Sequence, residues 1–182
     1  MAIISIGDVS FRYVQVSDAA YILQLRSMGI RKQALSPGAS SIRDQEQWLQ
    51  SYKEREQQGI EHYFIILHQD RPVGAVRVYS IDRSNGTFTW GSWVIQEGTK
   101  PEIAWLSVIL IYDFAFVHLE LAQAQFQVVS TNQNVIRFHR GFGAQQTEEG
   151  NGSIGFVLPK ASYARIRDTF LQRFWRRPAP AA

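Results

Sequence analysis

The chain has 182 residues, of which 45% are hydrophobic and 19% are charged, a composition typical of one globular domain rather than a disordered segment. It contains no cysteine, which excludes disulfides, thiolate nucleophiles and cysteine-ligated metals. The net charge of +3 is too small to indicate nucleic-acid binding, although it is compatible with a small anionic ligand.

The N-terminal residues lack the basic start and the long apolar core of a signal peptide. Residues 103–121 are the one candidate for a membrane span, but Asp113, His118 and Glu120 interrupt them, which favours a buried helix. We therefore expect a cytoplasmic protein without a membrane span.

The first third of the chain predicts one strand and two helices. Weak alternation indicates a strand over residues 11–16. Ser17-Asp18 then supplies an N-cap and a first-turn acid for a helix, and the Leu-Ser-Pro-Gly at residues 35–38 breaks the chain. A second helix begins at Ser41, with Asp44 at the capping-box position. The expected apolar stripes are Tyr21, Ile22, Leu25 and Met28 on the first helix, and Trp48, Leu49 and Tyr52 on the second.

Three strands joined by hairpins follow, at residues 63–67, 73–81 and 87–95. The first of them is apolar on both faces, as expected of a central strand. Asn85-Gly86 is the strongest hairpin signal in the chain. Gly91 interrupts the third strand, which indicates a bulge or a close approach by a ligand.

The remaining elements are a long helix from Pro101 to about Leu119, a strand over residues 124–128, a short helix over residues 132–141, and two strands at residues 144–147 and 153–158. A closing helix presents Tyr163, Ile166, Phe170, Leu171 and Phe174 on one face. We predict one α+β domain with a mixed sheet over residues 1–177, and a flexible tail at residues 178–182.

Two segments resemble a known family. Residues 132–144, Asn-Gln-Asn-Val-Ile-Arg-Phe-His-Arg-Gly-Phe-Gly-Ala, are similar to the Asn-x-x-Ala-Ile-x-x-Tyr-x-x-x-Gly-Phe segment of the GNAT-type N-acetyltransferases. The second match is a strand, loop and helix that ends in Tyr-Asp-Phe-Ala-Phe at residues 112–116. The runs at residues 49–56 and 91–95 resemble family members encoded with surface-polysaccharide genes, which are expected to acetylate nucleotide-linked deoxysugars.

This resemblance implies the GNAT fold, with a mostly antiparallel twisted sheet flanked by helices, and acetyl-CoA as the acyl donor. In that fold two neighbouring parallel strands splay apart, and the pantetheine of the cofactor fills the gap like an added strand. Val94 and Ile95 would offer their backbone groups to the pantetheine. A backbone N–H near Trp93 would meet the acyl oxygen.

The family's pyrophosphate loop, Gln/Arg-x-x-Gly-x-Gly/Ala, corresponds here to residues 99–104, of which only Ala104 keeps the pattern. Glu102 stands in place of a glycine, and an acid beside phosphates is unfavourable unless it points away. Gly98 permits a tight turn, and Lys100 supplies a positive charge. The resemblance therefore implies that the cofactor is contacted by Gly98, Thr99, Lys100, Ile103 and Ala104, with an altered affinity for its phosphates.

His139 aligns with the family's tyrosine, which is the proposed acid for the departing thiolate. An imidazolium can do the same work, but a histidine here can also simply pack on a short helix. The resemblance further implies cofactor contacts from Asn132, Asn134, Arg137 and Phe138. Asn132 equally suits a helix N-cap, and Arg137 an exposed basic face.

The resemblance implies that the acceptor is a primary amine, in a pocket between the first two helices and the three hairpin-joined strands. Tyr79 and Trp90 would offer aromatic surfaces there, although core packing explains such aromatics as well. No general base is evident; Asp82, Glu97 and Glu102 are candidates by position. A sugar amine needs none, because it is less basic than a lysine amine. The four histidines lack metal-ligand spacing, so we expect no metal.

Other functions stay open. The acceptor can be a nucleotide-linked amino sugar, a protein N-terminus or a small amine, and a non-catalytic protein that senses CoA or binds a partner is the alternative from another class. Arginines and aromatics alternate at residues 173–177, but cations also suit a helix C-terminus, so we expect no nucleic-acid partner. A homodimer is compatible with the sequence.

Overall fold

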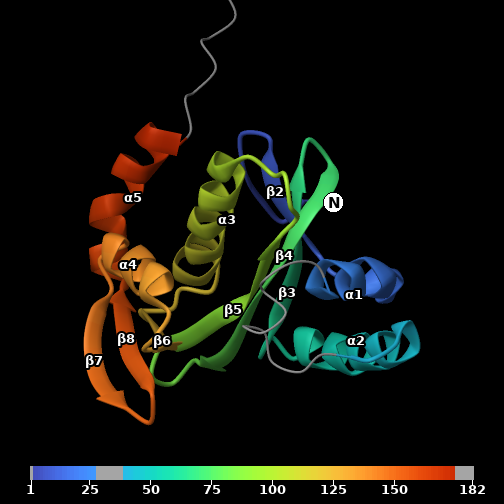
Figure 1. Cartoon of the computed structure of the whole chain (residues 1–182), viewed down its shortest axis with the longest axis horizontal. Helices are drawn as coiled ribbons and strands as arrows, with labels where there is room; N and C mark the ends of the chain where they lie inside the picture. The colour runs from blue at the N-terminus through green and yellow to red at the C-terminus, as the bar shows by residue number, and fades with distance from the viewer. Residues whose placement is uncertain (1, 28–38, 175–182) are drawn as a thin grey trace, which may run out of the picture.

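Eight strands form one mixed sheet in the computed structural model, which describes residues 2–27 and 39–174 (Figure 1). The strands are β1 Ile4–Ile6, β2 Val9–Tyr13, β3 His62–His68, β4 Arg71–Asp82, β5 Thr87–Ile95, β6 Gln123–Val129, β7 Gln145–Gly150 and β8 Ser153–Pro159. Their order across the sheet is β1-β2-β3-β4-β5-β6-β8-β7. All neighbours are antiparallel except β5 and β6, which are parallel.

Helices cover both faces of this sheet (Figure 1). They are α1 Ala19–Ser27, α2 Ile42–Gln57, α3 Pro101–Asp113, α4 Gln133–Gly141 and α5 Lys160–Phe174. Buried side chains of α1 and α2 pack on one face, against Tyr63, Ile65 and Ala75. Those of α3, α4 and α5 pack in a second cluster on the other face, with Phe64 and Val76. Because neighbouring side chains of β3 and β4 point to opposite faces, each strand contributes to both clusters.

Most of the predicted elements are confirmed, and the N-terminal region holds the main corrections. The first strand is not at residues 11–16, because β2 ends at Tyr13 and pairs with β1, a strand that the sequence did not predict. The first helix is not capped by Ser17. Asp18 instead accepts a hydrogen bond from the Gln15 backbone N–H, at 2.8 Å, and a 3₁₀ turn at Val16–Asp18 leads into α1.

The second helix begins as predicted, because the Ser41 hydroxyl accepts a hydrogen bond from the Asp44 N–H. The predicted hairpin at Asn85-Gly86 also joins β4 to β5. Met28, the break at residues 35–38, the arginines and aromatics at residues 175–177 and the tail at residues 178–182 lie outside the described residues, as does the division of the chain at residue 177.

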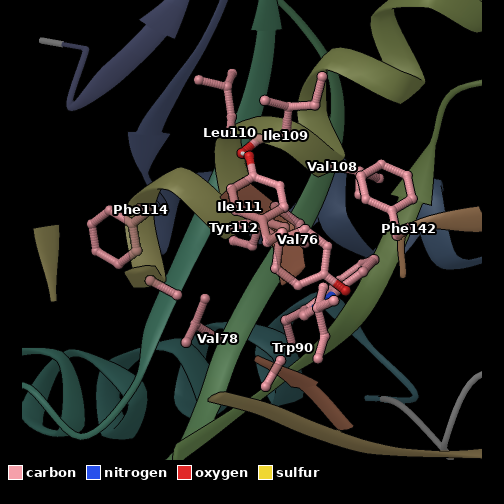
Figure 2. Packing of buried hydrophobic residues seen from close by; sticks show 14 of the residues in the cluster. Val76, Val78, Trp90, Val108, Ile109, Leu110, Ile111, Tyr112, Phe114 and Phe142 are labelled. Atoms are coloured by element: carbon pink, nitrogen blue, oxygen red, sulfur yellow. Dashed lines mark hydrogen bonds between the residues drawn. The ribbon is translucent and has the colours of Figure 1, made fainter. Parts of the chain in front are cut away.

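The long apolar helix does not run unbroken to Leu119. α3 ends at Asp113, and a π-helical turn at Phe114–His118 continues it. In the described part of the chain, residues 101–118 alone have the length and hydropathy of a membrane span, yet 67% of that stretch is buried within the protein. The helix is therefore the core of the fold, as Figure 2 shows for the residues around Ile111 and Tyr112.

Candidate active site

The parallel strands β5 and β6 pair only at their beginnings. Thr87 is opposite Gln123 and Phe88 is opposite Ala124, and beyond them the two strands diverge. The divergence coincides with a bulge in β5, where the register against β4 shifts between Ala75 and Arg77. A bulge bends its strand, and Ser92 within it has a φ of 49°. The bulge that Gly91 indicated is therefore present, in the part of β5 that no longer pairs with β6.

A cavity of about 280 Å³ lies at this gap. Its walls come from the bulge of β5, the middle of β6 and one side of α4. The lining residues are Trp90, Gly91, Trp93, Phe126, Gln127, Asn134, Val135, Phe138 and His139. Five of the residues suggested by the sequence thus meet in one place. Phe126 and Gln127 were not predicted as site residues, because only the divergence of the strands exposes them to the cavity.

His139 is buried in this wall and is surrounded by aromatic rings. The ring centroids of Phe126, Phe138 and Trp90 lie 4.1, 5.1 and 5.8 Å from that of His139. Burial without a compensating charge lowers the pKa of His139 to about 4. The imidazolium suggested by the sequence is therefore the disfavoured form at neutral pH, and the ring is neutral.

Two buried polar atoms beside the cavity lack a hydrogen-bond partner, Nδ1 of His139 and Nε1 of Trp90. The Trp90 ring meets the ring of Tyr112 on α3 edge-on, with centroids 5.6 Å apart (Figure 2). Unpartnered buried polar atoms are rare in native proteins, and at a cavity they indicate a polar ligand or an ordered water.

The short helix α4 carries His139, Phe138 and Asn134 into the cavity. Asn132 is its N-cap, and the Asn132 side chain accepts a hydrogen bond from the Val135 N–H at 3.4 Å. Arg137 is exposed and does not line the cavity. Of the four residues assigned to the cofactor on this helix, Asn134 and Phe138 therefore reach the cavity, while Asn132 has a capping role.

The first turns of α3 contact the site through Trp105 and Ser107. Trp105 in the first turns of α3 stacks on Phe138, with centroids 5.0 Å apart, and Trp93 Nε1–H donates to the hydroxyl of Ser107 at 3.1 Å. Pro101 occupies the first turn as predicted, and Gly98 has a φ of 82°, which favours glycine. The remaining residues assigned to this region, Val94, Ile95, Thr99, Lys100, Ile103 and Ala104, do not line the cavity.

The two suggested acceptor residues lie on opposite faces of the sheet. Trp90 packs with Tyr112 on the side of α3, whereas Tyr79 stacks against Arg77 on the side of α2, with the guanidinium 4.7 Å from the Tyr79 ring. The prediction of one acceptor pocket that contains both Tyr79 and Trp90 beside the first two helices is thus wrong. Trp90 pairs with Val78, and successive residues of a strand, such as Val78 and Tyr79, face opposite sides of the sheet. Gly91 links the faces: a Cβ there would lie 3.0 Å from the Tyr79 hydroxyl.

Arg77 belongs to a polar cluster that the sequence did not reveal. Its guanidinium also lies 5.4 Å from the Trp48 ring and forms an ion pair with the buried Glu61 at 3.1 Å. Arg55 binds Glu61 as well, at 2.7 Å. The cluster joins α2 to β4 and to the start of β3, and it brings aromatic and cationic side chains together on the α2 side of the sheet.

The acids considered as bases do not line the cavity. Asp82 accepts hydrogen bonds from Ser84 and Asn85 in the hairpin turn, which lower the pKa of Asp82 to about 2. Glu97 and Glu102 are exposed. Within residues 2–27 and 39–174, no three His, Asp or Glu side chains are grouped so that they could hold a metal ion.

A strand gap, a helix N-terminus beside it and a second helix bearing a polar residue are the parts of an acyl-CoA site. The family model for the acetyltransferase (GNAT) domain matches residues 8–145. The chain belongs to the GNAT acetyltransferases. The resemblance seen in the sequence is thus confirmed, as is the mixed-sheet fold.

Solved structures agree with this assignment. FdhC, described as a nucleotide-linked sugar GNAT, is 32% identical over 93% of this chain and 96% of its own, with a TM-score of 0.82. RimJ from Mycobacterium smegmatis, solved with CoA-disulfide, is 16% identical over 91% of this chain and 88% of its own, with a TM-score of 0.74. A spermidine N-acetyltransferase SpeG variant from Vibrio cholerae is 16% identical over 87% and 98%, with a TM-score of 0.72. At 16% identity, the RimJ and SpeG structures show the likeness of fold alone. No curated protein sequence matches the chain.

The GNAT domain and the likeness to FdhC make the protein an N-acetyltransferase, in a family that uses acetyl-CoA. The described residues fit such a donor. The diverging strands leave one side of β5 without a partner strand, and the unpartnered Nδ1 of His139, in the cavity wall, suits a polar ligand.

Proposed function

We propose that this GNAT protein transfers the acetyl group of acetyl-CoA to the primary amine of a nucleotide-linked amino sugar. The observation that carries the proposal is the gap between β5 and β6, with His139 and Trp90 beside it. The likeness to FdhC, at 32% identity over nearly the whole of both chains, supports the choice of acceptor.

The backbone of β5 decides which residues receive the pantetheine. Gln96 N–H donates to Val73 on β4 at 2.8 Å, and successive residues of a strand direct their backbone groups to alternate sides. Ile95 therefore faces the gap and Val94 faces β4. We assign to Ile95 and the bulge near Trp93 the backbone contacts that hold the donor in register.

The first turn of α3 and the loop before it suit the phosphates of the donor. The N–H groups of a helix N-terminus favour anions, and Gly98, Thr99 and Lys100 precede it. Glu102 is exposed, so its carboxylate can turn toward water. Asn134 and Phe138 on α4 line the opposite wall of the cavity.

When bound, acetyl-CoA supplies a thioester carbonyl to the amine. In this environment His139 acts as a neutral imidazole that donates a hydrogen bond to the departing sulfur, because its low pKa disfavours an imidazolium. None of the described residues that line the cavity is acidic, and in this proposal the proton of the amine passes to water. That arrangement suits a sugar amine, a useful part of which is neutral at pH 7.

The acceptor side also favours a phosphorylated sugar over a polyamine. A polyamine needs an acidic groove, but Glu61 is paired with Arg55 and Arg77. Arg77, flanked by Trp48 and Tyr79, offers a cation and two aromatic faces instead, which suit a phosphate and a base.

The test is acetyl transfer from acetyl-CoA to nucleotide-linked amino sugars, with spermidine and an N-terminal peptide as competing acceptors. We expect the sugar to have the highest kcat/KM, and His139→Gln to lower kcat with little change in acetyl-CoA affinity. His118→Gln, at an exposed histidine, is the matched control. Preferred transfer to spermidine or peptide would overturn the acceptor. Absence of acetyl-CoA binding at millimolar concentration would overturn catalysis itself and favour a partner-binding protein.

A further inference from the structure

A second hollow lies on the sheet face opposite α4 and α5. Along β6, Ala124 and Val128 are buried beneath those helices, while Gln125 and Gln127 are exposed on the other side. The hollow is a trough of about 490 Å³ across four strands. Its lining consists of Thr89, Gln125, Phe126, Gln127, Thr147, Gly155, Phe156 and Val157.

Glycines at two points of this region let hydroxyl groups lie close over the sheet. At Gly155 on β8, a Cβ would lie 2.6 Å from Oγ1 of Thr147, and at Gly91 on β5 one would lie 3.0 Å from Oη of Tyr79. Gly155 pairs with Gln127 on β6. Gln127 and Gly91 line the same cavity, so Gln127 lies between the two glycines. The hydroxyls of Thr147 and Tyr79 and the side-chain amide of Gln127 therefore border one stretch of the sheet surface, between Gly155 and Gly91.

The trough adjoins the active-site cavity. Phe126 and Gln127 line both, and Gly91 lies at the junction beside the bulge. A ligand in the trough can thus extend one group into the cavity where His139 lies. On β4, next to Gly91, the same sheet surface carries Tyr79 and Arg77.

The chemistry of the lining selects the kind of ligand. Among the residues that the structure describes, no charged side chain lines the trough, which argues against a polyamine and against a phosphate. Its polar groups are the amides of Gln125 and Gln127 and the hydroxyls of Thr89 and Thr147, and amides and hydroxyls are the partners that sugar hydroxyls require. Thr89 already donates to the backbone carbonyl of Gln125 at 2.8 Å. Of the other polar groups, Gln127 lines both hollows, and Thr147 lies over Gly155, the residue that pairs with Gln127.

We infer that this trough binds the pyranose ring of the acceptor, with Gln127 and Thr147 hydrogen-bonded to ring hydroxyls and the amine directed through the gap toward His139. The inference rests on the proposed function and adds the residues that recognise the sugar. The nucleotide would then lie on the side of Arg77 and Tyr79, since the trough itself holds no cation.

The test is titration calorimetry with non-reacting probes, UDP-glucose and dTDP-glucose, each against UDP or dTDP alone. Because of its sugar ring, each sugar nucleotide should bind more tightly than the corresponding free nucleoside diphosphate. Gln127→Ala and Thr147→Val should each reduce that gain about 5-fold, as expected for one lost neutral hydrogen bond, without weakening the diphosphate. Gln123→Ala is the control, on the same strand but at its paired end.

The outcomes separate the two proposals. If neither sugar nucleotide nor diphosphate binds at millimolar concentration, both the acceptor class and the trough are wrong. If sugar nucleotides bind but the ring adds nothing, or the two variants keep the full gain, the trough alone is wrong. If the variants change only the oligomeric state in sedimentation, the face is a contact between copies of the chain, and the inference is overturned.

Discussion

The neutrality of His139 predicts a specific dependence of stability on pH. Its pKa is about 4 in the folded protein against an ordinary value of 6.5, because the side chain is only 7% exposed and no opposite charge lies among its neighbours. Between those two values the unfolded chain binds the proton more readily than the folded one. The free energy of unfolding therefore rises with pH in that window. The contribution of His139 is fully present above pH 6.5 and is lost as the pH falls through 4.

The size of the effect follows from the same two values. The gap corresponds to roughly 3 kcal/mol when complete, of which about 2 kcal/mol is lost between pH 8 and pH 5. The comparison is with His139→Phe, which keeps a ring among the aromatic neighbours but cannot titrate. Burial also lowers the pKa of His62, but both proteins contain that residue, so the difference between them isolates His139.

The assay is urea unfolding of both proteins at several values between pH 8 and pH 5. We expect the wild type to lose about 2 kcal/mol more than the variant over this range, whatever their absolute stabilities. Parallel curves for wild type and His139→Phe would show that the imidazole is charged or solvated in the folded state. The neutral hydrogen-bond donor assigned to catalysis would then be wrong.

Three further predictions concern the scaffold that holds the site. Arg167→Met should lower stability by about 3–5 kcal/mol in thermal unfolding. The reason is that the buried carboxylate of Asp113 loses the guanidinium that binds it at 2.7 and 2.6 Å. Adding Asp113→Asn should recover part of this loss, and no recovery would contradict the ion-pair explanation. Ser41→Ala should destabilise by about 1 kcal/mol through loss of the α2 N-cap, with Ser41→Asp close to wild type, and equal losses in both would contradict a capping role. Gly74→Ala should be poorly folded by circular dichroism, since a Cβ would lie 2.5 Å from a backbone oxygen of β5, and an unchanged melting temperature would contradict that packing.

Local chemistry explains which elements the sequence predicted well. Asn85-Gly86 is a strong local turn signal, and it lies in the turn at residues 83–86, where Gly86 has a φ of 66°. Ser41 caps a helix within its own first turn. The three-residue β1 carries too few side chains for a periodic signal, and it forms because β2 pairs with it. Ser17 was mistaken for the cap, since the pattern could not show that Asp18 reaches back to the Gln15 N–H.

The site was predicted unevenly for the same reason. Residues on α4 were found because the motif is contiguous, and Asn134, Phe138 and His139 do line the cavity. Phe126 and Gln127 were missed because they alternate like any strand residues until β5 and β6 diverge. Glu61 and Arg77 are 16 positions apart, so their pairing exists only where β3 and β4 lie side by side.

The sequence by itself determined the family, the order of the elements and the presence of a histidine on the short helix, because each depends on residues that are adjacent or regularly spaced. Tertiary structure decided the opposite facing of Trp90 and Tyr79 and the charge state of His139. The first depends on the register of β4 and β5, which pairs Trp90 with Val78, the neighbour of Tyr79, and the second depends on rings from β5, β6 and α4 that exclude water from the imidazole. Desolvation is a property of the surroundings in space, so the same histidine in the same motif would be charged or neutral according to what packs around it.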